Sequence, residues 1–514
     1  MNLKKTVAIA AAAGALAAIS VPAMAFENEF HGIYNLKFFV SNYENGGTAQ
    51  IDPVGRTSNA TTPAVFGLDS TGAIVLVTPA KAASVTYTGQ EKRRSNNFFE
   101  QRARLQYIAK ASDDLKLVTH FELDTKFGGD KSGKYGVSSD AGVLDADGIM
   151  LETKHVYLDF NLGKSVNVKT GVMPVKDSLK GVFLDADVAG ILATSKISDA
   201  TVAGGYFRFK TESSNFIAPL AATGGYANYN SNSSAIGHDN GDIFILDGKY
   251  AINKNLNVGA SYYLLSDYSS ATPTTIHTFG VNSDAKIGPV AVSGFFAAQT
   301  GYTYLDATGK GAGATGLDAA TFKRRAASGY AANVAAKMAV GPGTLKTAGL
   351  FLTGDSDTAN GNNTSWTTST INTYAEGGMF LLFRTGVGGT TNDRTLSGGS
   401  FSNNYRGSIL YTLGYDATIT PKLYANTNVG MLWVAKSAKA PTNAVSGTPN
   451  GGDMLGTEIN LEAGYKVYDN LTAKIQLAYV ILGGAYTNTV LDAAGAPKTP
   501  EDPYTARIGL SYAF

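Results

Sequence analysis

The sequence predicts an all-β protein, an antiparallel up-and-down transmembrane β-barrel of about 18 strands, with 16 and 20 as the outer bounds. Apolar residues recur at every second position over segments of 9 to 14 residues, the period and length of a tilted strand that crosses a bilayer. Short and long connections between these segments alternate. Beyond residues 1–25, no segment approaches the roughly 18 uncharged apolar residues that a membrane-spanning helix needs.

The alternation is clearest in six of the predicted strands, which cover residues 30–40, 99–110, 115–124, 256–264, 471–479 and 504–514. In the last of these, one row is apolar and consists of Tyr504, Ala506, Ile508, Leu510, Tyr512 and Phe514. The residues between them are small or polar. Each strand therefore has one face suited to lipid and one suited to water.

The connections carry an independent signal. Short turns are expected at 111–114, 161–163, 197–199, 252–254, 287–288, 339–343, 418–420 and 469–470. Longer connections are expected at 42–97, 128–150, 174–187, 211–241, 267–274, 301–322, 355–403, 435–454 and 481–502. An up-and-down barrel has tight turns at one rim and long loops at the other. Two strand-like runs within the long loops, 74–78 and 379–384, are expected to form extra hairpins or to raise the strand count.

Residues 1–25 have the features of a secretory signal peptide. Lys4 and Lys5 precede an apolar segment, and Ala23-Met24-Ala25 is a small-x-small cleavage site. The mature chain is predicted to begin at Phe26, so that residues 26–514 form one barrel domain. A bilayer can be spanned only by helices or by a closed barrel, because an open sheet edge leaves backbone groups unpaired in hydrocarbon.

Composition narrows the function classes. The chain has no cysteine, which excludes a disulfide scaffold, covalently attached c-type haem and cysteine-based redox or metal chemistry. Without Lys4 and Lys5 it carries 40 basic and 41 acidic residues, so its charge gives no support for nucleic-acid binding. We predict no cofactor and no nucleic-acid partner.

Three weaker patterns in the sequence are candidate chemical sites. The GxGxxG match at Gly311–Gly316 lacks the strand and helix that present amides to pyrophosphate. Aspartates at 145, 147, 355 and 357 resemble parts of calcium loops but lack the closing glutamate; calcium in the loops stays open. The five histidines form no short-spaced metal pair, although a catalytic arrangement at one rim is not excluded by the sequence.

The polar row of the second and third strands supplies candidates for the lining of a pore. A guanidinium that faces lipid at mid-depth costs about 2–4 kcal/mol, so Arg102 and Arg104 are predicted to face water. Lys116, Glu122 and Asp124 continue this polar row on the neighbouring strand. The alternative is that these groups only solvate a plugged interior.

The segment from Gly171 to Asp187, followed by Val188-Ala-Gly-Ile-Leu, and the C-terminal aromatic resemble the porins of delta-proteobacteria. The resemblance implies a passive outer-membrane channel for ions and small hydrophilic solutes in a Gram-negative bacterium, without catalysis and forming a homotrimer. It implies contact with outer-membrane lipid and lipopolysaccharide. It also implies that Phe514 is part of the signal read by the barrel-assembly machinery.

In that family the third loop folds into the barrel and narrows it. The resemblance therefore implies that Asp177, Asp185 and Asp187 face a basic wall that includes Arg102 and Arg104, and that opposed charges bias which ions pass. At about fourteen residues the loop is short for this role, so the connection 42–97 or 355–403 is an alternative constriction.

Two other functions stay open. The barrel could sheathe a haem-bearing partner chain in an outer-membrane porin–cytochrome electron-transfer complex, or it could be a barrel enzyme. Substrate, ion preference, oligomeric state and gating are not readable from the sequence.

Overall fold

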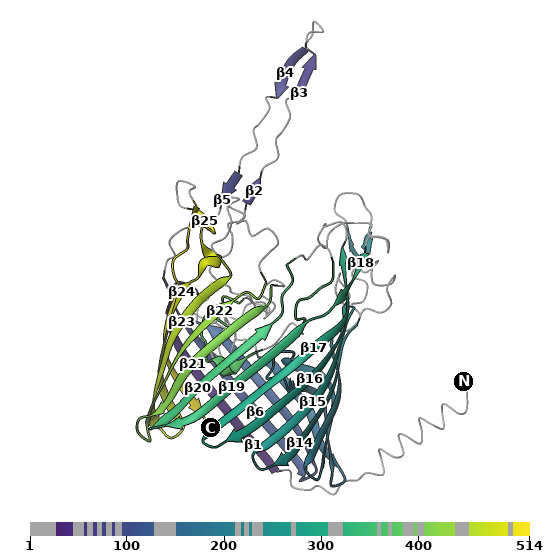
Figure 1. Ribbon diagram of the computed structural model, residues 1–514, viewed down its shortest axis with the longest axis vertical. Helices are drawn as coiled ribbons and strands as arrows, with labels where there is room; N and C mark the ends of the chain where they lie inside the picture. The colour runs from purple at the N-terminus through teal and green to yellow at the C-terminus, as the bar shows by residue number, and fades with distance from the viewer. Residues whose placement is uncertain are drawn as a thin grey trace, which may run out of the picture.

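The computed structural model describes residues 27–44, 56–58, 65–68, 74–78, 85–87, 95–127, 151–210, 217–219, 226–228, 240–268, 274–306, 322–356, 361–368, 373–383, 395–397, 406–436, 452–491 and 497–514. The predicted signal peptide, the GxGxxG match and Asp145, Asp147 and Asp357 lie outside these residues. The described chain is almost entirely β and forms one closed barrel (Figure 1).

Eighteen strands build the wall, which confirms the predicted fold class and strand count. In order they are β1 (Glu27–Ser41), β6 (Asn96–Ser112), β7 (Leu115–Lys126), β8 (Glu152–Leu162), β9 (Val166–Lys176), β10 (Asp185–Ile197), β11 (Ala200–Lys210), β14 (Gly241–Asn253), β15 (Leu256–Asp267), β16 (Thr274–Ile287), β17 (Val290–Asp306), β18 (Phe322–Ala327) with β19 (Tyr330–Val340), β20 (Gly343–Leu352), β21 (Ser408–Thr418), β22 (Leu423–Trp433), β23 (Met454–Tyr468), β24 (Leu471–Leu482) and β27 (Tyr504–Ala513).

Each wall strand pairs antiparallel with its neighbours. β18 and β19 both pair with β17 and together form the twelfth wall strand, interrupted at residues 328–329. The barrel closes where β1 pairs with β27, from Ile33 opposite Ala513 to Ser41 opposite Thr505. An even number of strands places the beginning of β1 and the end of β27 at the same rim.

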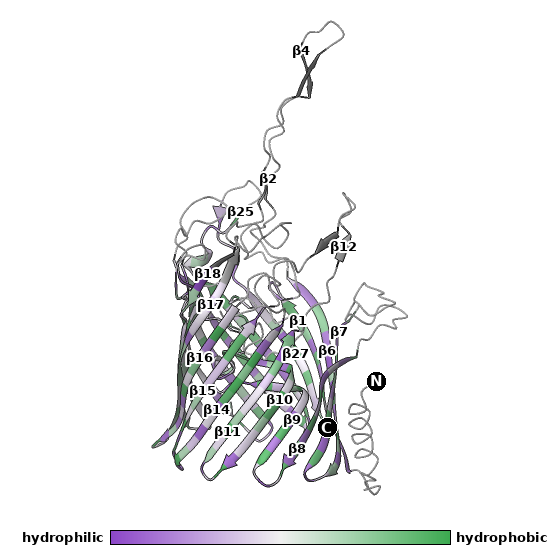
Figure 2. Cartoon of the chain, turned by 90° about the vertical axis from the view of Figure 1, so that its right-hand side faces the viewer, coloured by the Kyte–Doolittle hydropathy of each residue, from purple (hydrophilic) through white to green (hydrophobic). Residues whose placement is uncertain are grey.

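Burial alternates along the strands as the sequence predicts. On β14, Ile243 and Ile245 are buried while Phe244 and Leu246 are 43% and 52% exposed. Figure 2 shows apolar and hydrophilic residues alternating along the wall. Large apolar side chains thus face outward, the arrangement that favours contact with lipid over contact with water.

The two rims differ as predicted. The short-turn rim has tight turns, several of which contain a glycine with positive φ, such as Gly163 and Gly288. At the long-loop rim the connections include four small hairpins that do not pair with the wall. They are β2 (Arg56–Ser58) with β5 (Val85–Tyr87), β3 (Val65–Leu68) with β4 (Ile74–Thr78), β12 (Ile217–Pro219) with β13 (Tyr226–Asn228), and β25 (Val490–Leu491) with β26 (Pro497–Lys498).

The predicted run at 74–78 is β4, an extra hairpin strand outside the wall. The prediction for 379–384 was wrong for the five residues that the structure describes, because 379–383 form no strand. Met379, Leu381, Leu382 and Phe383 are fully buried, and the backbone N–H groups of residues 380–382 bond to a side chain instead of a neighbouring strand.

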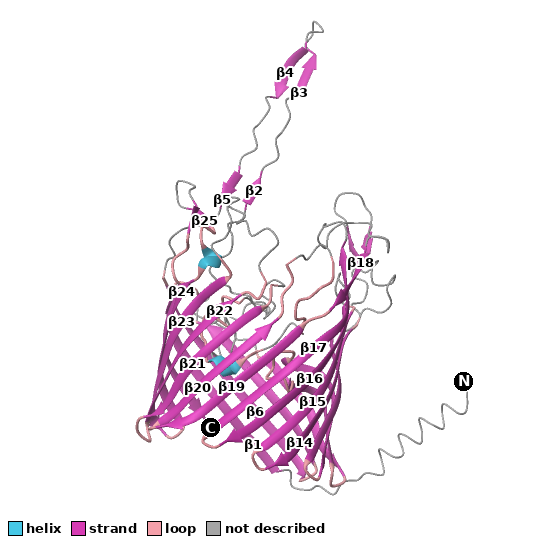
Figure 3. Cartoon of the chain, in the orientation of Figure 1, coloured by secondary structure: helices cyan, strands magenta, loops and turns pink. Residues whose placement is uncertain are grey.

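The buried apolar core lies inside the barrel. It combines inward side chains of the wall with two connections, residues 177–184 between β9 and β10 and the described parts of the connection between β20 and β21. The second connection contains the short 3-10 turn η2 (Ala375–Gly377), which lies within the barrel in Figure 3; η3 (Gly484–Tyr486) follows β24. In the part of the chain described here, no helix has the length and apolarity to cross a membrane.

Candidate pore and its constriction

The connection between β9 and β10 is a compact turn organised by one carboxylate. Asp177 is buried and accepts backbone N–H bonds from Leu179 (2.7 Å), Gly181 (2.9 Å), Phe183 (2.7 Å) and Leu184 (2.5 Å). Burial raises the pKa of Asp177 to about 6, while the four amide donors act against that shift. The expectation that Asp177 faces Arg102 and Arg104 was therefore wrong, since its oxygens are occupied by its own turn.

This turn is held against the inner face of β14 to β17. Ser178 donates to Asp247 at 2.7 Å, and the Phe183 ring stacks on Tyr263 with centroids 5.0 Å apart. Lys180 Nζ donates to Ser293 at 2.7 Å. Because Asp247, Tyr263 and Ser293 belong to the inward rows of their strands, the turn occupies the interior of the barrel.

The connection between β20 and β21 meets this turn from the other side. Lys180 Nζ lies 2.6 Å from Glu376 Oε1, and the Thr373 N–H donates to the Gly181 carbonyl at 3.1 Å. The buried indole of Trp366 donates to the Val182 carbonyl at 3.5 Å. We call residues 177–184 the short inner loop and the described residues 361–368 and 373–383 the long inner loop.

The long inner loop is anchored to the wall by a buried carboxylate. Glu458 on β23 accepts the backbone N–H groups of Phe380, Leu381 and Leu382 at 2.6 to 2.9 Å. Asn460, two residues along the same strand, donates to the Gly378 carbonyl at 2.9 Å. The described residues of the long inner loop are thus fixed within the barrel, beside the short inner loop.

The wall of β6 to β8 carries cross-strand ion pairs. Arg102 donates through Nε and Nη2 to Asp124 at 2.6 and 2.5 Å. Arg104 pairs with Glu122, which also lies 3.7 Å from Arg102. Lys116 pairs with Asp159 at 3.4 Å. Arg102, Arg104, Glu122 and Asp124 are therefore close together, whereas Lys116 lies further along β7, opposite Lys110, and pairs separately with Asp159. These charges are paired along one wall and do not face each other across the lumen.

The two remaining aspartates have partners of their own. Asp185 pairs with Lys176 at 2.7 Å and accepts a hydrogen bond from Thr373. Asp187 pairs with Lys154 and with His155, whose Nε2 lies 2.7 Å from Oδ1. The His155 Nδ1 lies 3.1 Å from His120 Nδ1. Neither aspartate pairs with Arg102 or Arg104.

The beginning of the connection 42–97 is also tied to the wall. Glu44 and Arg507 form an ion pair in which each side chain is only 2% exposed, and Thr505 donates to the same carboxylate. Sequence reasoning missed Glu44, Lys180, Glu376 and Glu458. Their partners are far away in sequence and follow no period, so no local pattern marks them.

Among the described residues no group of three or more histidine or acidic side chains could hold a metal ion. Asp355, one of the calcium candidates, is buried and pairs with Arg325 at 2.7 Å.

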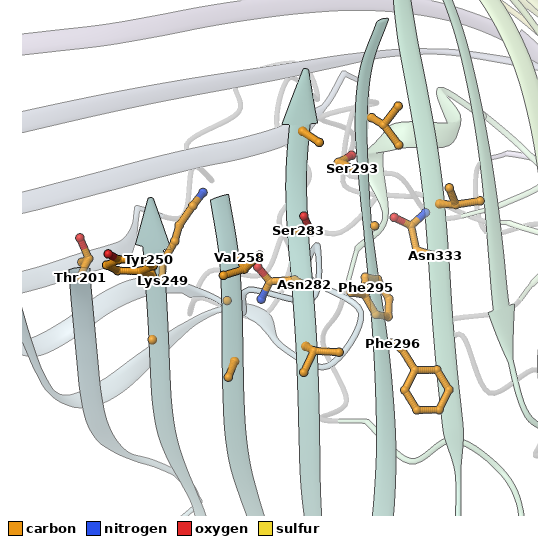
Figure 4. A pocket seen from close by; sticks show the side chains of 18 of the residues that line it. Thr201, Lys249, Tyr250, Val258, Asn282, Ser283, Ser293, Phe295, Phe296 and Asn333 are labelled. Atoms are coloured by element: carbon orange, nitrogen blue, oxygen red, sulfur yellow. The ribbon is translucent and has the colours of Figure 1, made fainter. Parts of the chain in front are cut away.

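Three cavities lie at or near the wall of β11 to β19. Two, of about 320 and 400 Å³, lie beside the tip of the short inner loop and share Lys180 and Asp284 in their linings. The third, of about 850 Å³, is lined by side chains from adjacent strands (Figure 4). Its lining includes the outward residues Phe296 and Val334, which are 51% and 61% exposed, so it opens mainly to the outer face.

No family model and no curated relative matches the sequence. Similar solved structures include OccK8 (OprE) of Pseudomonas aeruginosa, with 13% identity over 95% of this chain and 98% of that chain and a TM-score of 0.49. The outer membrane protein OpdK of the same organism has 11% identity, the same coverages and a TM-score of 0.48. OccAB1 of Acinetobacter baumannii has 14% identity over 95% of this chain and 96% of that chain, with a TM-score of 0.48.

Proposed function

We propose that the protein is an outer-membrane porin, a passive diffusion channel for ions and small hydrophilic solutes. One observation carries the proposal: a closed barrel of 18 strands, apolar outside, has cross-strand ion pairs on its inner wall and keeps cavities of about 320 and 400 Å³ beside its inner loops. Barrels of this size leave an aqueous channel when nothing fills them completely. In this proposal the short-turn rim faces the periplasm and the long-loop rim faces outward.

We also propose the more specific properties that the resemblance to porins implies. They are the relation to delta-proteobacterial porins, cleavage of residues 1–25, a homotrimer, contact with lipopolysaccharide, and assembly through recognition of Phe514. We also propose that the barrel has no catalytic activity and uses no cofactor.

The sheath of an electron-transfer complex is less well supported. A haem-bearing partner would need the barrel interior, and the two inner loops are fixed there by Asp177, Glu458 and the Lys180–Glu376 contact.

Liposome swelling tests the proposal. Vesicles that contain the folded protein should swell in solutions of small sugars, at rates that fall with sugar size. If vesicles with the protein are no more permeable to the smallest sugar than vesicles without it, the protein is not a diffusion channel.

A further inference from the structure

Three lysines without carboxylate partners line one cavity on the short-turn side of the inner loops. Lys254 lies in the turn between β14 and β15, Lys286 near the end of β16, and Lys337 near the end of β19. The cavity of about 400 Å³ also includes Lys180. None of Lys254, Lys286 and Lys337 forms an ion pair with a described residue.

The strand periodicity directs two of these lysines inward. Lys286 shares its face of β16 with the buried Ile276 and Thr278. Lys337 shares its face of β19 with Asn333 and Ala335, which are also buried. The ammonium groups therefore face the lumen and water instead of lipid.

The carboxylates of the cavity are already engaged. Glu376 pairs with Lys180 at 2.6 Å, and Asp284 pairs with Lys249 at 3.0 Å. Unlike the wall of β6 to β8, where each arginine has a carboxylate opposite it, this region keeps an excess of positive charge. Three like charges around one cavity repel each other, and an anion between them relieves that repulsion.

We propose that this cavity, the lysine vestibule, binds small multivalent anions on the periplasmic side of the constriction. The proposal rests on the proposed channel function and adds a binding site and ligand class to it. Ammonium groups bind carboxylate and phosphate oxygens as mobile point charges. A monovalent anion neutralises one lysine at a time, whereas a trivalent anion interacts with all three, so affinity should rise steeply with anion charge.

Block of the chloride current by citrate tests this inference. Single channels are recorded in about 0.1 M KCl, where the Debye length is about 10 Å, while citrate is titrated into both chambers. We expect citrate to block the wild-type current, and Lys286→Gln combined with Lys337→Gln to raise the half-blocking concentration about tenfold. Acetate at the same concentrations should block neither protein.

Lys474→Gln is the matched control. Lys474 lies on the inward face of β24 with the buried Gln476 and Ala478, near the same rim, but outside the lysine vestibule. Its removal should leave the citrate block within about twofold of wild type. Equal block of wild type and the double variant, or an equal loss of block in Lys474→Gln, would overturn the inference.

Two further measurements distinguish loss of the anion site from loss of folding or of the channel function. The double variant should keep the heat-dependent mobility of a folded barrel and conduct chloride without citrate. The wild-type block should weaken when KCl is raised to about 1 M, and a block independent of salt would contradict an electrostatic site. Absence of any wild-type current would contradict the channel function itself.

Discussion

Lys180 and Glu376 are 196 positions apart in the sequence, yet Nζ of the lysine lies 2.6 Å from Oε1 of the glutamate inside the barrel. The pair joins the short inner loop to the long inner loop. Their side chains are 22% and 16% exposed, so the pair is only partly screened by solvent. In the proposed channel, this contact makes the two loops one constriction.

Glu376→Gln is expected to loosen that constriction. A partly exposed ion pair of this kind contributes on the order of 1 kcal/mol, enough to populate arrangements in which the loops separate. Single-channel recordings should show a larger or noisier conductance than wild type. Asp416→Asn breaks the Lys346–Asp416 pair elsewhere in the barrel and should leave the conductance unchanged. The same conductance in wild type and Glu376→Gln would show that the pair does not limit the pore.

Asp177→Ala should release the short inner loop. The change removes the acceptor of four backbone N–H groups, and each buried donor left unpaired costs about 1–3 kcal/mol. We expect a small amine-reactive reagent to label Lys180 faster in the folded variant than in wild type, with an increase in conductance. Equal labelling of Lys180 in wild type and in a folded Asp177→Ala barrel would contradict this role.

Arg104 and Glu122 give a test of how the wall sets ion selectivity. Arg104→Gln leaves Glu122 with only the more distant Arg102, so the reversal potential across a salt gradient should move toward cation selectivity. Adding Glu122→Gln should reverse most of that shift, because the charge balance of the wall is restored. The shift should fade near 1 M salt, where the Debye length is about 3 Å. If the double variant is as cation-selective as Arg104→Gln alone, the Arg104–Glu122 pair does not set the ion selectivity.

Deletion of Phe514 should reduce the amount of assembled barrel. The Phe514 backbone exchanges two hydrogen bonds with Gly32, at 2.8 and 3.0 Å, and its ring packs beside Tyr512 at 5.5 Å. The residue therefore secures the closure between β27 and β1, besides its expected role as an assembly signal. Heat-modifiable protein in outer-membrane fractions measures the effect. Phe514→Tyr keeps the aromatic ring and should assemble normally, whereas wild-type levels after deletion would show that the residue is dispensable.

The wall was predictable because its signals are local. The apolar row from Tyr504 to Phe514 and the alternation of short turns with long loops both follow from a strand that has lipid on one side and water on the other. The same period predicts that Arg102 and Arg104 lie on one face. Their pairing with Asp124 and Glu122 depends on the register between β6 and β7, which the sequence of neither strand specifies alone.

The interior was less predictable because its contacts join distant residues. The run 379–383 has the composition of a strand, but Glu458 captures its backbone N–H groups and packing within the barrel buries its side chains. Asp177 has the residue type expected of a charged constriction, yet its local turn uses all of its acceptor capacity. In both places a single buried carboxylate overrides the pattern that surrounds it.

Single-channel recording of the purified, refolded protein in a planar lipid bilayer tests the central claim most directly. A barrel of this width with cavities beside its inner loops predicts discrete current steps that are ohmic at low voltage and grow with salt concentration. The bare bilayer with detergent alone should show none. Heat-modifiable, folded protein that inserts into the bilayer and produces no current steps would contradict the account.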